Sequence, residues 1–525
     1  MKRLPIYVLL FSLYPCLALL SENLREVEPS VVLRPTLASV LFVLGAFAAS
    51  YLLLRDQTKA ALATTLLSIL FFSYGHVYQL LEASPILGIS LGRHRYLAPL
   101  YLAVLAGGLW LILWRFKVPG SITPALNVAG LVLLAFPLIQ IAQFEARLSR
   151  GTQAAGDLAS SAQALSAPAD SPLPDVYYIV LDTYARHDIM QRELRFDNTP
   201  FLDDLRHLGF VVAECSRSNY GSTDPSLVSA LNLAYLPEIR NTLLERGVAG
   251  DDTSVLIKHS VVRDSLETLG YKTVAFDTTY EWTRLTDADY YLGPGRDRLD
   301  VQALGPFEVM YAKSTALLLL MDARQKYLEP SVGISNHPYR GHIEVQLLIL
   351  DELPRVATLP EPTFTFAHIL IPHVPYVFDA DGGIRTDPGF YGGGMAGPIN
   401  HEYFREGYVG EIQFVNRRLV QILTSILAES PTPPIVVIQG DHGFWGAGGD
   451  SGKLSILNAY YLPDGRGNSI YSDITPVNTF RLVFDLYFGT SYGLLDDLSY
   501  LDPAAGPIPE TASACRHETG EGSIP

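Results

Sequence analysis

The sequence predicts an α/β protein in two parts: an N-terminal bundle of about five transmembrane helices, and a globular domain in which helices cover both faces of a mainly parallel sheet. Two observations lead to this fold class. Long apolar segments crowd the first third of the 525 residues, whereas short β-branched runs alternate with amphipathic segments in the remainder. A third observation indicates where an active site would lie, because one of these runs ends abruptly in Asp441 and His442.

Five apolar segments within residues 1–145 are each about as long as a helix must be to cross a hydrocarbon core roughly 30 Å thick. They are Leu4–Leu20, Leu37–Leu54, Ala60–Leu81, Tyr96–Trp114 and Ile122–Phe144, and none contains Lys, Arg, Asp or Glu. The first is also compatible with a signal peptide, but no clear small-x-small cleavage site follows it, so a retained span is favoured. Arginines and lysines divide evenly between the two sets of loops and tilt the orientation only slightly towards a cytoplasmic N-terminus.

The rest of the chain divides by composition into a linker, a domain and a tail. Residues 146–173 are rich in Ala, Ser, Gln and Pro without periodicity and are interpreted as a linker. Residues 174–509 form the globular domain, and residues 510–525 are a polar, loose tail. The formal net charge of −16 argues against a nucleic-acid partner. Cys215 and Cys515 have the option of pairing if the domain is extracytoplasmic.

The globular domain alternates expected strands with expected helices. The strands are expected at Val176–Leu181, Phe210–Ala213, Thr273–Phe276, Thr363–Leu370 and Ile435–Gln439. Val255–Leu269 and Tyr403–Leu427 have the apolar periodicity of helices. This alternation predicts a mainly parallel sheet with helices on both faces.

Chemistry-bearing residues follow two of these strands. Asp182 ends the first strand of the domain, and Asp441 and His442 end the last one. An isolated Asp at a strand end is more often a turn or cap residue, so each position alone is weak evidence. Together they offer two carboxylates and an imidazole at the carboxyl edge of one sheet, where open α/β sheets build their active sites.

The segment Asn219–Ser226 contains a candidate nucleophile. Its Ser222, Thr223 and Asp224 precede a helix suggested by Pro225–Asn232, and a simple capping role would explain them. A hydroxyl at a helix N-terminus also lies in a positive partial field, which favours a group that receives a phosphoryl or sulfuryl unit. Thr223 is the expected nucleophile.

Two histidines, His368 and His373, flank the end of the strand at Thr363–Leu370. Pro372 lies between them, so their spacing does not match the helical histidine pair of zinc hydrolases. Catalytic roles in acid–base chemistry or substrate contact are therefore preferred over metal ligation for both. The expected metal ligands are Asp182, Thr223, Asp441 and His442, which suit one divalent ion, Zn²⁺ or Mn²⁺.

At these residues the chain resembles the alkaline phosphatase/sulfatase superfamily, and in particular its membrane-anchored sulfatase-like proteins, such as lipoteichoic acid synthases and phosphoethanolamine transferases. The resemblance covers about residues 174–500 and implies an alkaline-phosphatase-like α/β/α sandwich as the catalytic domain. It also implies Thr223 as nucleophile, the four metal ligands named above, and substrate contacts from His373 and Asn219. The transferases usually carry Glu at the position of Asp182, which is one methylene shorter.

The resemblance leaves alternatives for the reaction. Sulfatases of the superfamily convert a Cys or Ser to formylglycine, and Thr223 cannot yield that aldehyde, so sulfate ester hydrolysis is the disfavoured alternative. The favoured reaction moves a phospho-headgroup from a phospholipid donor, through a phosphothreonine, to a glycan, a lipid or water. Such an enzyme would be a multi-pass protein of the plasma (inner) membrane with its catalytic domain in the periplasm. The rival from another class is a non-catalytic, membrane-anchored binding or assembly module.

Overall fold

The protein is described here from a computed structural model. It covers residues 4–24, 27, 29–83, 93–115, 119–167, 172–245, 255–278, 280–293, 306–327, 337, 339–391, 402–444, 449–502 and 506–508. The expected loose tail at 510–525 lies outside these residues. The chain divides into two compact units, one of residues 1–146 and 297–332 and the other of residues 147–296 and 333–525.

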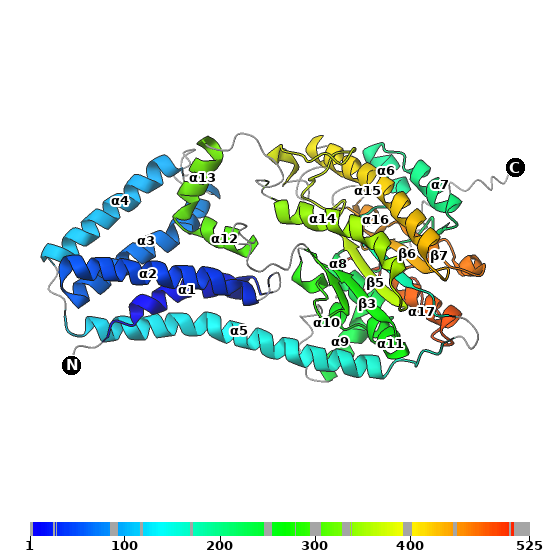
Figure 1. Cartoon of the computed structure of the whole chain (residues 1–525), viewed down its shortest axis with the longest axis horizontal. Coiled ribbons are helices and arrows are strands. Elements are labelled where there is room, and N and C mark those ends of the chain that lie inside the picture. Colours follow the sequence, from blue (N-terminus) through cyan, green and yellow to red (C-terminus); the bar gives the residue numbers. More distant parts are fainter. Residues whose placement is uncertain are drawn as a thin grey trace. The chain divides into compact units, whose positions relative to one another are not determined.

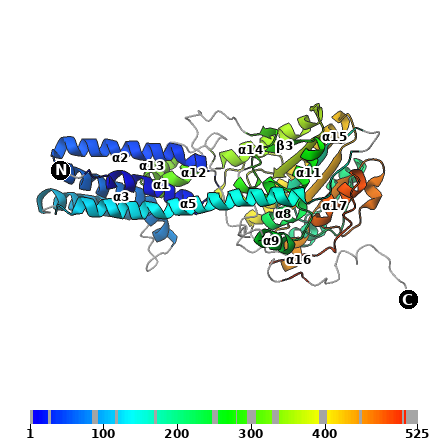
Figure 2. The same cartoon turned by 90° about the horizontal axis from the view of Figure 1, so that it is seen from below.

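The first unit is a bundle of apolar helices (Figures 1 and 2). In chain order these are α1 (Tyr7–Glu22), η1 (Pro29–Val32), α2 (Leu33–Leu54), α3 (Gln57–Ala83), α4 (His94–Trp110), which continues as a π-helical turn η2 (Leu111–Arg115), and α5 (Ile122–Ser160). Within the described ranges, four stretches are long and apolar enough to span a membrane: Pro29–Leu54, Gln57–Leu81, His94–Arg115 and Ile122–Ser160. The first of the five expected spans, α1, has 16 residues and is shorter than the other four.

Two helices that follow much later in the chain belong to the same unit. They are α12 (Pro306–Ser314) and α13 (Leu317–Tyr327), and both lie within the span 174–509 that the sequence assigned to the globular domain. Phe307 and Tyr311 of α12 are buried in one apolar core with residues of α1, α2 and α3.

Helix α5 differs from the prediction at its C-terminal end. Residues 146–160 were expected in a linker, but they continue α5 without a break as far as Ser160. The physical reason is composition: this stretch is rich in Ala, Arg, Leu and Gln, all strong helix formers. Ala154 and Ala155 also pack into a core of the second unit, which adds burial that a linker would lack.

The second unit is built on a seven-stranded sheet in the order β2-β7-β6-β1-β5-β3-β4. The strands are β1 (Val176–Leu181), β2 (Val211–Val212), β3 (Lys272–Phe276), β4 (Tyr290–Leu292), β5 (Thr363–Ile369), β6 (Ile435–Gly440) and β7 (Asn458–Tyr461). Neighbours pair in parallel except at β7, which is antiparallel to both β6 and β2. The sheet is therefore mainly parallel, as predicted, with one reversed strand near its edge.

Helices cover both faces of this sheet, which makes the domain an α/β/α sandwich (Figures 1 and 2). Alternate residues of β1 enter two different cores: Tyr177 and Ile179 one, Tyr178 and Val180 the other. Helices α6 (His187–Leu194), α7 (Thr199–His207), α14 (Arg340–Glu352) and α15 (Glu402–Glu429) contribute to the first core. Helices α8 (Thr223–Leu231), α9 (Leu236–Glu245), α10 (Val255–Lys258), α11 (Val261–Leu269) and α17 (Pro476–Tyr487) contribute to the second.

Candidate active site

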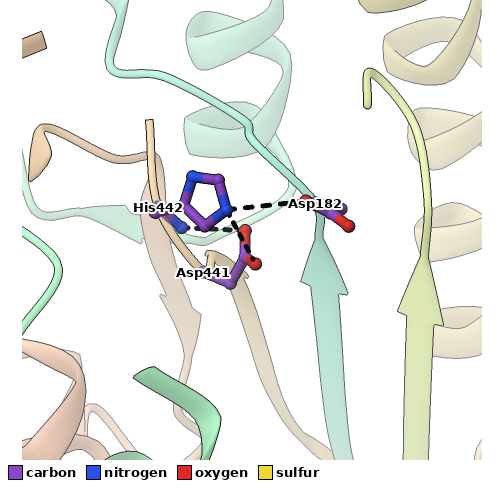
Figure 3. A group of neighbouring side chains, drawn as sticks. All are labelled: Asp182, Asp441 and His442. Atoms are coloured by element: carbon purple, nitrogen blue, oxygen red, sulfur yellow. Dashed lines mark hydrogen bonds and ion pairs between the residues drawn. The ribbon is translucent and has the colours of Figure 1, made fainter. Parts of the chain in front are cut away.

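The site begins at the ends of two neighbouring parallel strands. In the register of β1 and β6, Leu181 lies opposite Gly440, so the next residues, Asp182 and Asp441, leave the sheet at the same level (Figure 3). Both carboxylates are almost fully buried, with exposed fractions of 1% and 2%. The sequence predicts a mainly parallel sheet, and within it the pairing of β1 with β6 brings these two acids together.

A strained turn fixes the orientation of Asp441. Thr183 has a φ of 61°, a left-handed conformation that is rare for a β-branched residue and costs of the order of 1–3 kcal/mol. This conformation lets the Thr183 backbone N–H donate to Oδ1 of Asp441 over 2.9 Å. The backbone N–H of His442 donates to the same oxygen over 2.8 Å. With Oδ1 occupied, Oδ2 of Asp441 is left for another partner.

The imidazole of His442 has Nε2 turned towards these acids (Figure 3). Its Nδ1 lies 2.7 Å from the carbonyl oxygen of Gly443, so Nδ1 carries the proton and Nε2 carries the lone pair. Nε2 lies 3.6 Å from Oδ2 of Asp441 and 3.9 Å from Oδ1 of Asp182. It also lies 3.4 Å from the hydroxyl oxygen of Thr223.

These atoms fit the requirements of a divalent ion. Oδ1 of Asp182 and Oδ2 of Asp441 are buried and have no hydrogen-bond partner among the described residues. Burying such oxygens costs desolvation free energy unless a cation binds them. Ligand atoms of Asp182, Asp441 and His442 all lie within 4.8 Å of one another. Nε2 of His442 lies 3.6 and 3.9 Å from the two carboxylates, so the three residues would be able to hold one divalent ion together. Burial, and then repulsion by Asp441, raise the pKa of Asp182 well above its usual range, so a bound cation would displace a proton there.

Thr223 is the first residue of helix α8 (Thr223–Leu231), which begins two residues before the helix expected at Pro225–Asn232. The preceding Ser222 is exposed, and its side chain makes no capping hydrogen bond. Thr223 itself is 7% exposed. Its hydroxyl therefore lies between the positive end of a helix and the ligand cluster.

The two predicted histidines occupy different positions. His368 lies within β5 with Nε2 3.8 Å from Oδ2 of Asp182, and neither ring nitrogen has a hydrogen-bond partner among the described residues. Burial lowers the pKa of His368 to about 4, so it is neutral at pH 7. His373 is only half-buried, and its Nδ1 lies 2.6 Å from the carbonyl oxygen of Val374. His373 is thus the more accessible of the two.

The loop that carries His373 is hydrogen-bonded to a buried carboxyl group, that of Glu411 on α15. Its Oε1 accepts backbone N–H groups of Val377 and Phe378 at 2.8 and 3.2 Å. Burial raises the pKa of Glu411 well above its usual range, because the charged form would be desolvated.

Glu411 is therefore expected to make the protein less stable as the pH rises. An unfolded Glu ionises near pH 4.3, so its favourable contribution is complete below that pH and is lost as the pH rises towards the higher pKa of the folded state. Glu411→Gln keeps the accepting oxygen and cannot ionise, so its melting temperature should fall less between pH 5 and pH 8 than that of the wild type. Thermal unfolding of the detergent-solubilised chain measures this. Glu429→Gln, at the exposed end of the same helix, should behave as the wild type, and equal slopes for all three proteins would contradict the expectation.

Asn219 has a structural position. Its side-chain amide donates to the carbonyl oxygen of Leu498 over 2.8 Å, and its oxygen accepts the backbone N–H of Val477, at the start of α17, over 2.8 Å. The resemblance implies that Asn219 contacts substrate. In the structure, the amide nitrogen and the amide oxygen of Asn219 both form hydrogen bonds within the protein, which connect the loop before Thr223 to α17 and to Leu498.

Lys453 was not among the predicted site residues. It lies on the short helix α16 (Gly449–Leu454), and its side chain packs against Gly221: a Cβ added to that glycine would meet Cε at 2.6 Å and Nζ at 3.1 Å. The ammonium group thus lies beside the loop that ends in Thr223. No motif marks this lysine, because it approaches Gly221 only through the fold.

The glycines that flank Asp441 and His442 are required by close backbone contacts. A Cβ on Gly440 would lie 2.5 Å from the carbonyl oxygen of Tyr184, and one on Gly443 would lie 2.1 Å from that of Gly452. Either methyl group would force a backbone to move.

Gly440→Ala is accordingly expected to separate β6 from the turn after β1, and so to pull Asp441 away from Thr183. We expect a loss of stability of about 1–3 kcal/mol and a clear loss of metal affinity. Gly341→Ala is the matched control, because nothing lies within 4 Å of a Cβ at that helical position. Denaturant unfolding and a metal titration of both variants make the comparison, and a Gly440→Ala protein that binds metal as the wild type does would show that this contact is not needed.

Comparison with known proteins gives no family model and no curated protein that matches this sequence. Among solved structures, the chain is similar to the C-terminal periplasmic domain of EcEptC from Escherichia coli in complex with Zn, at 13% identity and a TM-score of 0.45, over 68% of this chain and 99% of that one. It is also similar to the integral membrane lipooligosaccharide phosphoethanolamine transferase A from Neisseria meningitidis (13% identity, TM-score 0.37, 92% of this chain and 95% of that one). A third similar structure is BT1596, a 2-O GAG sulfatase (13% identity, TM-score 0.40, 63% and 73%).

Phosphoethanolamine transferases and sulfatases are the two classes of protein that the sequence motifs resemble. Identities of 13% and TM-scores below 0.5 do not transfer an activity, however.

Proposed function

We propose that the chain is a membrane-anchored, metal-dependent phosphotransferase or phosphodiesterase that forms a covalent phosphothreonine at Thr223. The observation that carries this proposal is the position of the Thr223 hydroxyl. It lies at the N-terminus of α8 and 3.4 Å from Nε2 of His442, beside two buried carboxylate oxygens, Oδ1 of Asp182 and Oδ2 of Asp441, that have no hydrogen-bond partner among the described residues. A hydroxyl placed in this way is suited to receive an anionic group.

Asp182, Asp441, His442 and Thr223 would hold one divalent ion, with Zn²⁺ or Mn²⁺ as the candidates. A bound ion would lower the pKa of the Thr223 hydroxyl and neutralise charge on the transferred group. The positive end of the α8 dipole and the nearby ammonium of Lys453 would add further positive potential for that group.

The reaction would proceed in two displacements at phosphorus. In the first, Oγ1 of Thr223 gives its proton to solvent water and bonds to the phosphorus of a lipid phosphodiester, while the bond from phosphorus to the lipid alcohol breaks. His373 donates a proton to the departing oxygen, and His368 stays neutral and makes polar contacts. In the second, a hydroxyl of a glycan, a lipid or water attacks phosphorus and gives its proton to His373. The bond from phosphorus to Thr223 breaks, and Oγ1 takes a proton back from solvent water.

Transfer of sulfate in place of phosphate is the alternative within the same fold. Sulfatases of the resembled superfamily use formylglycine, which threonine cannot form, and Leu227 stands where their motif carries arginine. Both departures favour phosphoryl transfer.

The location proposed for this activity is the outer side of the plasma (inner) membrane, facing the periplasm. The helical unit anchors the chain in a membrane, and a site attached to it would meet lipid donors. Cys215 forms a disulfide, with its partner outside the described residues, and disulfides persist in oxidising compartments. The partners would thus be a phospholipid donor and a glycan or lipid acceptor.

Trapping the intermediate tests the proposal. The full chain in vesicles would be mixed with phospholipids that carry an isotope-labelled phospho-headgroup, quenched in acid and digested. Mass spectrometry should find the labelled group on the peptide that contains Thr223. Labelled headgroup released or transferred without any adduct on Thr223, or an adduct on another residue, would reject the covalent mechanism. Turnover of sulfate esters alone would favour the alternative.

A further inference from the structure

Helices α12 and α13 follow one another closely and are together called the interfacial hairpin (residues 306–327). Along the chain the hairpin lies between β4 and α14 of the catalytic domain, yet it belongs to the unit of the apolar N-terminal helices (Figures 1 and 2). The chain therefore passes between the two units at three places, after residues 146, 296 and 332, and not only once through a linker.

Direct backbone contact joins the hairpin to α3. The N–H of Ala316, in the turn between α12 and α13, donates to the carbonyl oxygen of Phe71 over 2.8 Å. Gly75, one helical turn further along α3, lies so close to α12 that an added Cβ would meet the carbonyl oxygen of Lys313 at 2.0 Å. Such an approach requires glycine, so the contact is a specific feature of this sequence.

Polar side chains fix the hairpin to other helices of the unit. The hydroxyls of Ser39 on α2 and Tyr311 on α12 lie 2.8 Å apart and are buried. Asp322 of α13 lies 2.7 Å from Nε2 of His94, at the start of α4, whose Nδ1 lies 2.9 Å from the hydroxyl of Tyr74. These contacts reach three different helices, so the hairpin has one defined position within the unit.

Helix lengths give the depth of the hairpin in a membrane. From Gln57, the start of α3, to Gly75 is 18 residues, or about 27 Å along the axis. From Leu54, the end of α2, back to Ser39 is 15 residues, or about 22 Å. Since Leu54 and Gln57 flank one tight connection at one end of the bundle, and the hydrocarbon core is about 30 Å thick, both contacts lie near its opposite boundary.

The outward face of the hairpin is apolar. Leu317 and Leu320, three residues apart on α13, are 40% and 67% exposed, whereas Leu318 between them is 7% exposed and packs inward. Comparable exposure occurs at Leu41 of α2 and Leu100 of α4, at 60% and 57%, on helices long and apolar enough to span the membrane. The exposed side chain of Lys313 adds a positive charge beside the turn, where its stem allows it to reach lipid phosphates.

We propose that the interfacial hairpin is a lipid-binding element that inserts into the boundary of the hydrocarbon core opposite the connection between α2 and α3. Leu317 and Leu320 contact acyl chains, and Lys313 contacts lipid phosphates. The chain would thus bind the membrane through its spanning helices and also through the interfacial hairpin, which lies within the sequence of the globular domain. This inference does not depend on the reaction proposed above.

Fluorescence quenching in vesicles tests the insertion. A bimane probe would be attached through Leu320→Cys in a Cys16→Ala background, with the Cys215 disulfide retained, and the full chain reconstituted in phosphatidylcholine. Brominated lipid should quench this probe by about twofold or more, and aqueous iodide should quench it only weakly, as for a side chain 5–10 Å below the interface. The matched control is Leu244→Cys on α9, which is 61% exposed and should show the reverse pattern. Iodide quenching at position 320 as strong as at position 244, with no effect of brominated lipid, would overturn the proposal.

A second pair of variants tests the docking contact. Added to the labelled protein, Gly75→Ala should push α12 away and increase iodide quenching at position 320. Gly107→Ala on α4 is its control, because nothing lies within 4 Å of a Cβ there. Equal quenching with Gly75→Ala and Gly107→Ala would show that Gly75 does not position the hairpin.

Discussion

Replacing Thr223 by alanine is expected to lower turnover of phosphodiesters by at least about 10³-fold, because loss of a nucleophile removes the covalent step altogether. The fold should survive, since Thr223 is at the first position of α8, where alanine is accepted. Asp182, Asp441 and His442 remain in place, so the variant should still bind one metal ion. Hydrolysis of bis(p-nitrophenyl) phosphate by the full chain, together with elemental analysis, measures both properties.

Two other substitutions make this result specific. Thr223→Ser keeps the hydroxyl and should retain activity within about tenfold of the wild type. Ser222→Ala removes the neighbouring exposed hydroxyl, which makes no capping bond, and should leave activity unchanged. Undiminished turnover by Thr223→Ala would exclude Thr223 as the nucleophile. A large loss of turnover with Ser222→Ala would indicate Ser222 as the nucleophile.

Much of the fold of the second unit could be predicted because local pattern and tertiary role agree there. The strand at Val176–Leu181 has the bounds expected from its β-branched run, since all six residues are buried between two layers of helices. The acids at the ends of β1 and β6 come together because those strands are parallel neighbours. In the structure, Asp182 and Asp441 come together through that pairing, and Thr223 reaches His442 from the helix that it begins. Their role as metal ligands stays a prediction.

Other features depend on contacts between residues far apart in the sequence. Residues 306–327 form two helices of 9 and 11 residues, too short to be recognised as membrane segments, and only their contacts with α2, α3 and α4 place them in that unit. Lys453 approaches the site through α16, and Asn219 is used to hold α17. The continuation of α5 to Ser160 reflects helix propensity and burial of Ala154 and Ala155, which a scan for linker composition overlooks.

Removing the charge of Asp441 should abolish metal binding while preserving the local structure. Asp441→Asn keeps an oxygen to accept the N–H groups of Thr183 and His442, but it loses the negative charge at the atom that faces Nε2 of His442. Changing even a neighbour of a metal ligand costs about 10–100-fold in affinity, so loss of the ligand itself should cost at least the upper figure, with a similar or greater loss of phosphodiester turnover.

A buried aspartate at the other end of the same strand provides the matched control for Asp441→Asn. Asp175 precedes β1, and its Oδ1 accepts the backbone N–H of Thr363 over 2.7 Å, far along the strand from the ligand cluster. Asp175→Asn should therefore retain one metal ion per chain, whereas Asp441→Asn should retain none after equilibrium dialysis. In the wild type the affinity should weaken as the pH is lowered, because a proton competes for Asp182, whose pKa is raised by burial and by Asp441. Stoichiometric metal in Asp441→Asn, or turnover by a wild-type chain that holds no metal at all, would mean that the cluster of Asp182, Asp441 and His442 is not the metal site on which phosphoryl transfer depends.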